Sequence, residues 1–131
     1  TWPPGVTAWG KISRGLFKPM MSLLRFDIPQ VDELLGDEGL SLEEYGISGR
    51  IIHTPGHSPG SVSVLLDTGD AFVGCMAQNS VPFCLKPRLP IYAQDIEEVK
   101  KSWQVLIAEG ARTIHPGHGK SFSIDVIQEV L

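Results

Sequence analysis

The chain has 131 residues and contains few of the features that several common classes of protein depend on. Its two cysteines cannot make a disulfide framework, and a reduced or metal-bound role is as open for them as a bridge. No apolar run approaches the ~18 residues that a membrane-spanning helix needs. The net charge of −4 argues against non-specific nucleic-acid binding, which needs an excess of positive charge. We therefore expect neither a nucleic acid nor a membrane as a partner.

Length and composition together predict one folded domain. Hydrophobic residues make up 42% of the chain and charged residues 20%, which is the composition of a globular protein. A chain of this length has room for a real core. Fourteen glycines and ten prolines divide the sequence into short segments. This punctuation favours a mixed α and β chain with many turns.

Charge is segregated in the first third of the chain. Four bases and no acid occur up to Phe26, and seven acids and no base follow between Asp27 and Gly49. Two solvated faces of neighbouring segments would explain this pattern. A basic lid near an anionic substrate is the alternative interpretation.

The N-terminal segment carries weak signals of regular structure. Residues 1–20 contain several prolines, glycines and tryptophans, and we predict an irregular lead-in there. A helix is expected to begin with Pro19 in its first turn and to run through Phe26. A second short helix is predicted over residues 30–35. Together, residues 1–39 are expected to form a helical lead-in or lid.

The rest of the chain alternates between strand and helix patterns. One amphipathic helix is predicted over residues 95–109, with Asp95 as its N-cap, Glu98 three residues later as in a capping box, and Gly110 at its end. Its apolar side must pack against something, and the sheet is the available partner. The strands are predicted near residues 47–53, 61–66, 71–75 and 112–115.

All four histidines lie in two short segments that follow predicted strands. In each segment a Pro-Gly pair comes directly before a histidine, which is His57 in the first and His118 in the second. A rigid turn presets the imidazole, so two such turns at neighbouring strand ends favour a metal site. Cys75, at the end of a strand, is a third candidate, whereas Cys84 has no such placement. Tight turns with polar tips remain the alternative, because two histidines do not complete a zinc site.

Four features then occur in a fixed order along the chain. They are Thr-Pro-Gly-His-Ser-Pro-Gly-Ser at 54–61, a hairpin ending in Gly74, a capped helix, and Pro-Gly-His-Gly at 116–119. In this order they resemble the C-terminal half of the metallo-β-lactamase-fold hydrolases, in the general hydrolase branch. The resemblance implies an α+β fold, in which one mostly antiparallel sheet with helices on one face forms half of an αββα sandwich. Residues 1–131 would then be a single partial domain, with the half-fold over 40–131.

The resemblance also implies roles for individual residues. His57 and His118 match metal ligands of the family, and zinc is the expected cofactor, whereas His53 and His115 match structural positions. Cys75 stands where the family usually has an aspartate that bridges two metals. A thiolate bridges two hard sites less well than a carboxylate, so this change counts against a second metal.

The His-x-His-x-Asp-His motif of the family is absent from the sequence. We therefore predict the C-terminal part of a zinc-dependent hydrolase that is inactive by itself, with no catalytic residue of its own. Its expected partner is the missing N-terminal half or a second copy of the chain. A non-catalytic half-domain for oligomerisation or partner binding is the alternative, and redox sensing by Cys75 and Cys84 is a third. Thioesters, lactones, β-lactams and phosphoesters all stay open as substrates.

Overall fold

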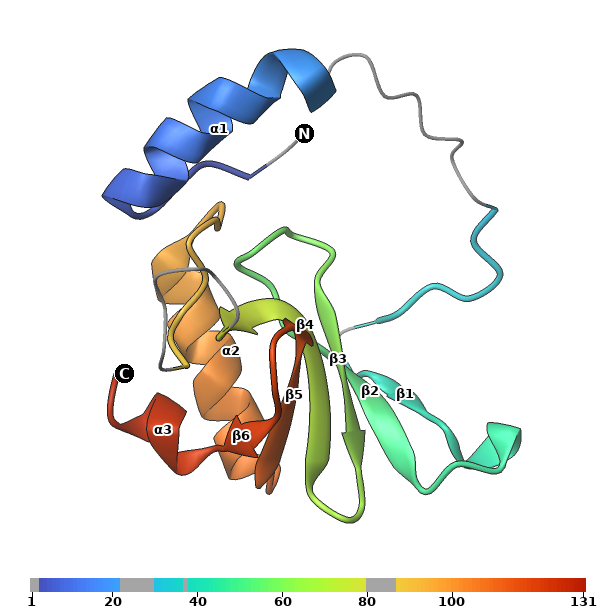
Figure 1. The fold of residues 1–131 in the computed structure, drawn as a ribbon. Helices are drawn as coiled ribbons and strands as arrows, with labels where there is room; N and C mark the ends of the chain where they lie inside the picture. The colour runs from blue at the N-terminus through green and yellow to red at the C-terminus, as the bar shows by residue number, and fades with distance from the viewer. Residues whose placement is uncertain (1–2, 22–29, 37, 80–86) are drawn as a thin grey trace.

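A computed structural model describes residues 3–21, 30–36, 38–79 and 87–131, and six strands of this part form one mixed sheet (Figure 1). The strands lie side by side in chain order, and only β4 and β5 run parallel. They are β1 (Leu40–Ser41), β2 (Gly49–His53), β3 (Val62–Leu66), β4 (Asp70–Gln78), β5 (Thr113–His118) and β6 (Phe122–Ser123). The helices are α1 (Ala8–Met21), α2 (Ile96–Ala108) and α3 (Asp125–Gln128), and a 3-10 turn spans Glu43–Tyr45.

The predicted strands are confirmed, although two of them extend further than expected. Strand β4 continues past Gly74 to Gln78, and β5 includes Pro116 and His118. The register between them shifts after Phe72 and again after Gly74, which has a positive φ of 53°. Each shift leaves extra β4 residues opposite β5 and bends the strand. The pairing that extends β4 is with a strand about forty residues further on, which a local pattern does not reveal.

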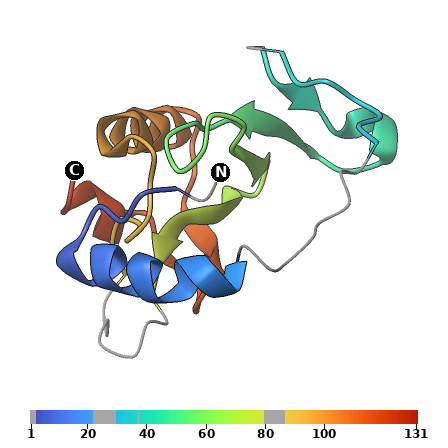
Figure 2. The same ribbon diagram turned by 90° about the horizontal axis from the view of Figure 1, so that it is seen from above.

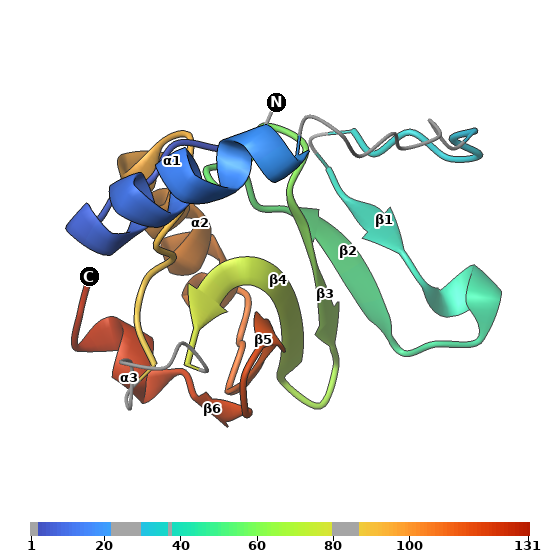
Figure 3. The same cartoon turned by 45° about the horizontal axis from the view of Figure 1, so that its top comes forward.

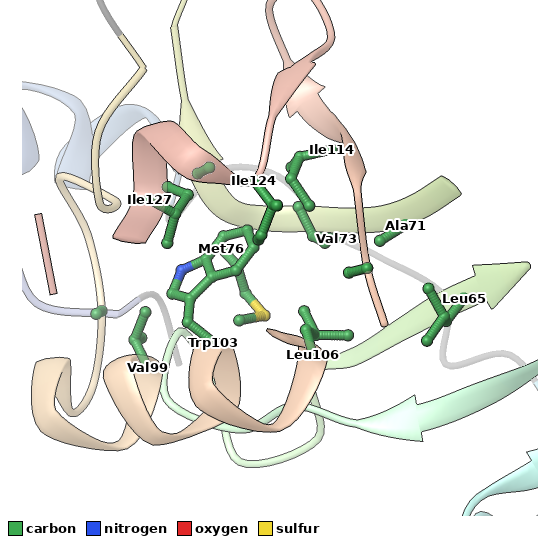
Figure 4. Close-up of a cluster of buried hydrophobic side chains, with 13 residues drawn as sticks. Leu65, Ala71, Val73, Met76, Val99, Trp103, Leu106, Ile114, Ile124 and Ile127 are labelled. Atoms are coloured by element: carbon green, nitrogen blue, oxygen red, sulfur yellow. The ribbon is translucent and has the colours of Figure 1, made fainter. Parts of the chain in front are cut away.

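Helix α2 covers one face of the sheet and closes the core, as predicted. The Asp95 side chain accepts hydrogen bonds from the backbone N–H groups of Glu97 and Glu98, at 2.9 and 3.1 Å. This satisfies two of the donors that a helix N-terminus leaves free. Trp103 and Leu106 point from the helix into a cluster with Met76 of β4, and all three are essentially buried (Figure 4).

The opposite face of the sheet, which we call the outer face, is only partly buried. Register pairs Ile51 with Val64, Val64 with Phe72 and Phe72 with His115, so these side chains point the same way. On this face Val62 and Phe72 are 44% and 47% exposed. The sheet therefore has a closed inner face and an apolar outer face that is open to solvent in the described part of the chain.

The prediction of an irregular segment over residues 1–20 was wrong. Residues Ala8–Met21 form helix α1, where an irregular lead-in was expected, and Pro19 lies in its last turn rather than its first. Thr7 starts the helix, because its hydroxyl accepts from the Gly10 N–H at 3.0 Å and its carbonyl from the Lys11 N–H. Five large apolar residues at helical spacing go with this start: Trp9, Ile12, Leu16, Phe17 and Met20.

Residues 30–35 form no helix, and Leu34 is 90% exposed. A short helix needs packing to be stable, and this segment has little. The predicted helical stretch through Phe26 and the interpretation of Cys84 lie outside the described residues. No helix in the described part is long and apolar enough to cross a membrane.

Helix α1 is attached to the rest of the molecule through the segment that precedes α2. Backbone hydrogen bonds join Val6 to Ile91 and Ala93 to Pro4, and the Ser13 hydroxyl bonds the Tyr92 hydroxyl. Seen from above, α1 and α2 lie on either side of the end of β4 (Figure 2). Helix α1 therefore lies near the sheet edge at which β4 ends (Figure 3).

Candidate functional site

The two Pro-Gly-His segments meet the same edge of the sheet. Strands β2 and β4 are each antiparallel to β3, and β5 is parallel to β4, so all three run in one direction. Their C-terminal ends therefore share an edge, which is the upper edge in Figure 1. His57 follows β2, Cys75 lies inside β4 three residues before its end, and His118 ends β5. The topology thus places the two Pro-Gly-His segments at one edge of the sheet, with Cys75 inside the strand between them.

The first Pro-Gly-His segment packs against the beginning of α2. The Gly56 carbonyl accepts hydrogen bonds from the N–H groups of Gln94 and Asp95, at 2.9 and 3.0 Å. Gly56 has a φ of 125°, and a Cβ there would lie 2.4 Å from the Val99 nitrogen. Only glycine fits a site with this conformation and this contact. The Pro-Gly turn is therefore required by packing against α2, whatever its histidine does.

His57 is oriented by one hydrogen bond. Its Nδ1 lies 2.7 Å from the Tyr92 carbonyl oxygen, which can only accept, so Nδ1 carries the proton. The lone pair is then on Nε2. Metal-binding histidines are commonly oriented in this way by a backbone carbonyl. The half-buried His57 is accordingly preset to offer Nε2 as a ligand.

Cys75 and His118 lie on neighbouring parallel strands. Gly74 pairs with Pro116, and Gln78 pairs with His118, so Cys75 falls in the irregular stretch between the two pairs. A Cβ on Gly117 would come within 3.2 Å of the Gly74 backbone, so the strands approach closely here. Burial raises the pKa of the half-buried Cys75 thiol. A thiol must lose its proton to bind zinc, so the raised pKa weakens zinc binding by Cys75.

The described residues at this sheet edge do not form a metal centre. Within residues 3–21, 30–36, 38–79 and 87–131, no group of three or more His, Cys, Asp or Glu side chains could hold a metal ion. A structural zinc site needs four ligands and a catalytic one three with water. The described residues of this chain alone therefore do not fit a zinc ion. The assignment of His57, Cys75 and His118 as ligands stays a prediction.

The other two histidines have structural partners. The His53 Nε2 lies 2.7 Å from the Pro59 carbonyl oxygen and closes the first loop across its base. His115 lies between the Asp70 carboxylate and the Ser121 hydroxyl, at 2.8 and 2.9 Å, and its ring stacks on Phe72. Asp70 lies 45 residues from His115, so no local pattern could have linked these two residues, whereas Ser121 is only six residues from the histidine.

Comparison with known proteins identifies the fold of this chain. The sequence matches no model of a protein family and no curated protein. Among solved structures, it is similar to an archaeal metallo-beta-lactamase superfamily protein from Sulfolobus tokodaii, with 22% identity and a TM-score of 0.61. It is also similar to the B3 metallo-beta-lactamase BLEG-1, at 23% and 0.62, and to TTHA1623 in a di-iron-bound form, at 21% and 0.60.

These alignments cover most of this chain but only part of the other proteins. They take in 92%, 86% and 86% of this chain, and 48%, 53% and 54% of the respective matched chains. The chain thus spans about half the length of the structures it matches. At these identities the likeness establishes the fold and not the activity. This protein has the fold of about half of a metallo-beta-lactamase superfamily protein, which confirms the predicted fold class.

Proposed function

Because the chain has half of a metallo-beta-lactamase fold, we propose that it is the C-terminal part of a zinc-dependent hydrolase of that superfamily. The observation that carries this proposal is the common sheet edge of the two Pro-Gly-His segments. One related structure is in a di-iron-bound form, so the fold supports metal binding elsewhere. The substrate class stays open among thioesters, lactones, β-lactams and phosphoesters.

In this proposal the chain supplies ligands and the missing part supplies the rest of the site. His57 offers a preset Nε2, His118 ends β5, and Cys75 lies on the adjacent strand β4. The further ligands and the water-activating carboxylate would come from the absent His-x-His-x-Asp-His motif. The chain by itself is then inactive as a zinc hydrolase, because general-base positioning is typically worth ~100- to 10,000-fold in rate.

The upstream reading frame and the metal content of the full gene product test this proposal together. A His-x-His-x-Asp-His segment encoded before Thr1, and bound zinc in the full product, are the expected findings. His57→Ala and His118→Ala should each lower the zinc content. His53→Ala is the matched control, because His53 bonds the Pro59 carbonyl and should leave the zinc content unchanged. A natural start codon next to Thr1 would overturn the proposal.

A non-catalytic half-domain is the second candidate, and the outer face favours it. That face carries exposed apolar side chains, with Val62 and Phe72 44% and 47% exposed. Burial contributes ~25 cal/mol per Å² of apolar surface, so this face favours association. The partner would be a second copy of the chain or the missing half. Sedimentation of the purified chain separates the cases, since a clean monomer at tens of micromolar contradicts self-pairing.

A further inference from the structure

A polar network on the outer face links side chains from distant parts of the chain. Ser121, in the turn between β5 and β6, has its Oγ 2.9 Å from His115 Nδ1. His115 Nε2 lies 2.8 Å from Asp70 Oδ1 at the start of β4. The Thr68 hydroxyl donates to the other carboxylate oxygen of Asp70, at 2.6 Å. A hydroxyl, an imidazole and a carboxylate are thus joined in series, each within hydrogen-bonding distance of the next.

The protonation pattern of this series follows from the donors. The hydrogen bonds from His115 and Thr68 lower the pKa of the Asp70 carboxyl, so Asp70 is ionised and can only accept. The proton of a neutral His115 ring is therefore on Nε2. Nδ1 is left as an acceptor, and the Ser121 hydroxyl donates to it. The ring cannot tilt freely, because it stacks on Phe72 with centroids 4.6 Å apart.

We propose that Ser121 is a nucleophile toward carboxylic esters, with His115 as its general base and Asp70 as the residue that orients His115. A hydroxyl within reach of a base that a third group orients is the arrangement that activates serine. In the usual arrangement the serine contacts Nε2 of the histidine and the carboxylate contacts Nδ1. Here Asp70 contacts Nε2 and Ser121 contacts Nδ1, so the two nitrogens have exchanged roles. Either nitrogen of imidazole can take a proton, so the exchange preserves the chemistry.

The reaction has two balanced steps. The Ser121 oxygen attacks the ester carbonyl and its proton passes to His115 Nδ1, and the leaving alcohol departs with that proton as the acyl–oxygen bond breaks. Water then attacks the acyl-serine, gives a proton to Nδ1, and the serine oxygen recovers it as the carboxylic acid leaves. No metal and no further reactant takes part. This activity is therefore independent of the proposed zinc chemistry.

The surroundings of Ser121 indicate what kind of ester fits. None of the backbone hydrogen bonds within the described residues uses the N–H group of Lys120 or Ser121 as a donor. An N–H group beside the nucleophile is the kind of donor that stabilises the oxygen that becomes negative during attack. Phe72, 47% exposed, lies under the His115 ring and offers an apolar surface. Esters of short apolar acids, such as butyrates, match these surroundings.

The test uses the whole 131-residue chain with two probes. A fluorophosphonate, which modifies activated serines, should form one adduct that peptide mapping assigns to Ser121. Hydrolysis of 4-nitrophenyl butyrate should fall at least tenfold in Ser121→Ala and about 100-fold in His115→Gln, the range for loss of a general base. Ser123→Ala is the matched control, because its hydroxyl bonds Asp125 and no histidine. It should keep both the adduct and the rate.

Two further outcomes would overturn the proposal. One is an unmodified Ser121 after exposure to the fluorophosphonate, with Ser121→Ala hydrolysing the ester as fast as the parent chain. The other is loss of hydrolysis on addition of a chelator, because a serine mechanism needs no metal. Circular dichroism of each variant checks that it is folded, and adduct mapping on the parent chain decides the question even if a variant is not.

Discussion

The inner and outer faces of the sheet are built from the same strands but differ in what covers them. On the inner face, side chains such as Ala71 and Ile114 are fully buried beneath α2. On the outer face, Val62 and Phe72 stay largely exposed although they are equally apolar. Strand sequence alone therefore does not decide burial here; a covering helix does. In a two-layered sandwich both faces would be covered, so the difference marks where a partner is expected.

The largest expected effect is a loss of stability from a substitution on the inner face. Trp103 is fully buried at the centre of the core cluster, so Trp103→Ala removes its packing and leaves a cavity. The free energy of unfolding should fall by about 3–5 kcal/mol, measured by urea denaturation. Val105→Ala on the same helix is the control, because Val105 is 42% exposed and should change stability by less than about 0.5 kcal/mol. Equal losses would show that the inner face is not the core.

The second effect concerns the outer face and its proposed partner. If two copies pair through this face, Val62→Lys should weaken self-association at least tenfold, measured by sedimentation, because it places a charge in an apolar interface. Val105→Lys is the matched control, since both valines are exposed to a similar extent, at 44% and 42%. Equal weakening by both substitutions would show that the association does not use the outer face.

The third effect is on the helix that covers the inner face. Asp95→Ala removes a side chain that caps two N–H groups of α2. The expected loss is about 1 kcal/mol in the free energy of unfolding, again from urea denaturation. Asp95→Asn is the control, because asparagine caps almost as well and should keep most of the stability. A loss in Asp95→Asn as large as in Asp95→Ala would mean that the charge and not the cap stabilises the helix.

The features that could be predicted from the sequence are those with local signals. Helix α2 has a cap, an apolar stripe and a terminal glycine within a few residues of one another, and its prediction was confirmed. The Pro-Gly-His segments are equally local, and both were found at the expected edge. Helix α1 was missed because prolines and glycines around it suggested irregular structure, whereas Thr7 caps it. The contact between Asp70 and His115 depends on the pairing of β4 with β5, which no short window of sequence contains.

The smallest effect that we expect is a pH dependence of the network on the outer face. The hydrogen bond from His115 lowers the pKa of the half-buried Asp70 carboxyl, whereas in the unfolded chain this carboxyl has its ordinary pKa of about 3.9. A carboxyl whose pKa is lower in the folded state contributes stability above its unfolded pKa, and this contribution is lost as the pH falls through the folded pKa.

The urea midpoint of the parent chain should therefore exceed that of Asp70→Asn at pH 6. At pH 3 the two midpoints should approach each other. Because the Asp70 side chain is 35% exposed to solvent, the difference at pH 6 should be small, and salt should reduce it further. A gap between the parent and Asp70→Asn that persists unchanged to pH 3 would mean that Asp70 acts on stability through its shape or its hydrogen bond to Thr68 rather than through its charge.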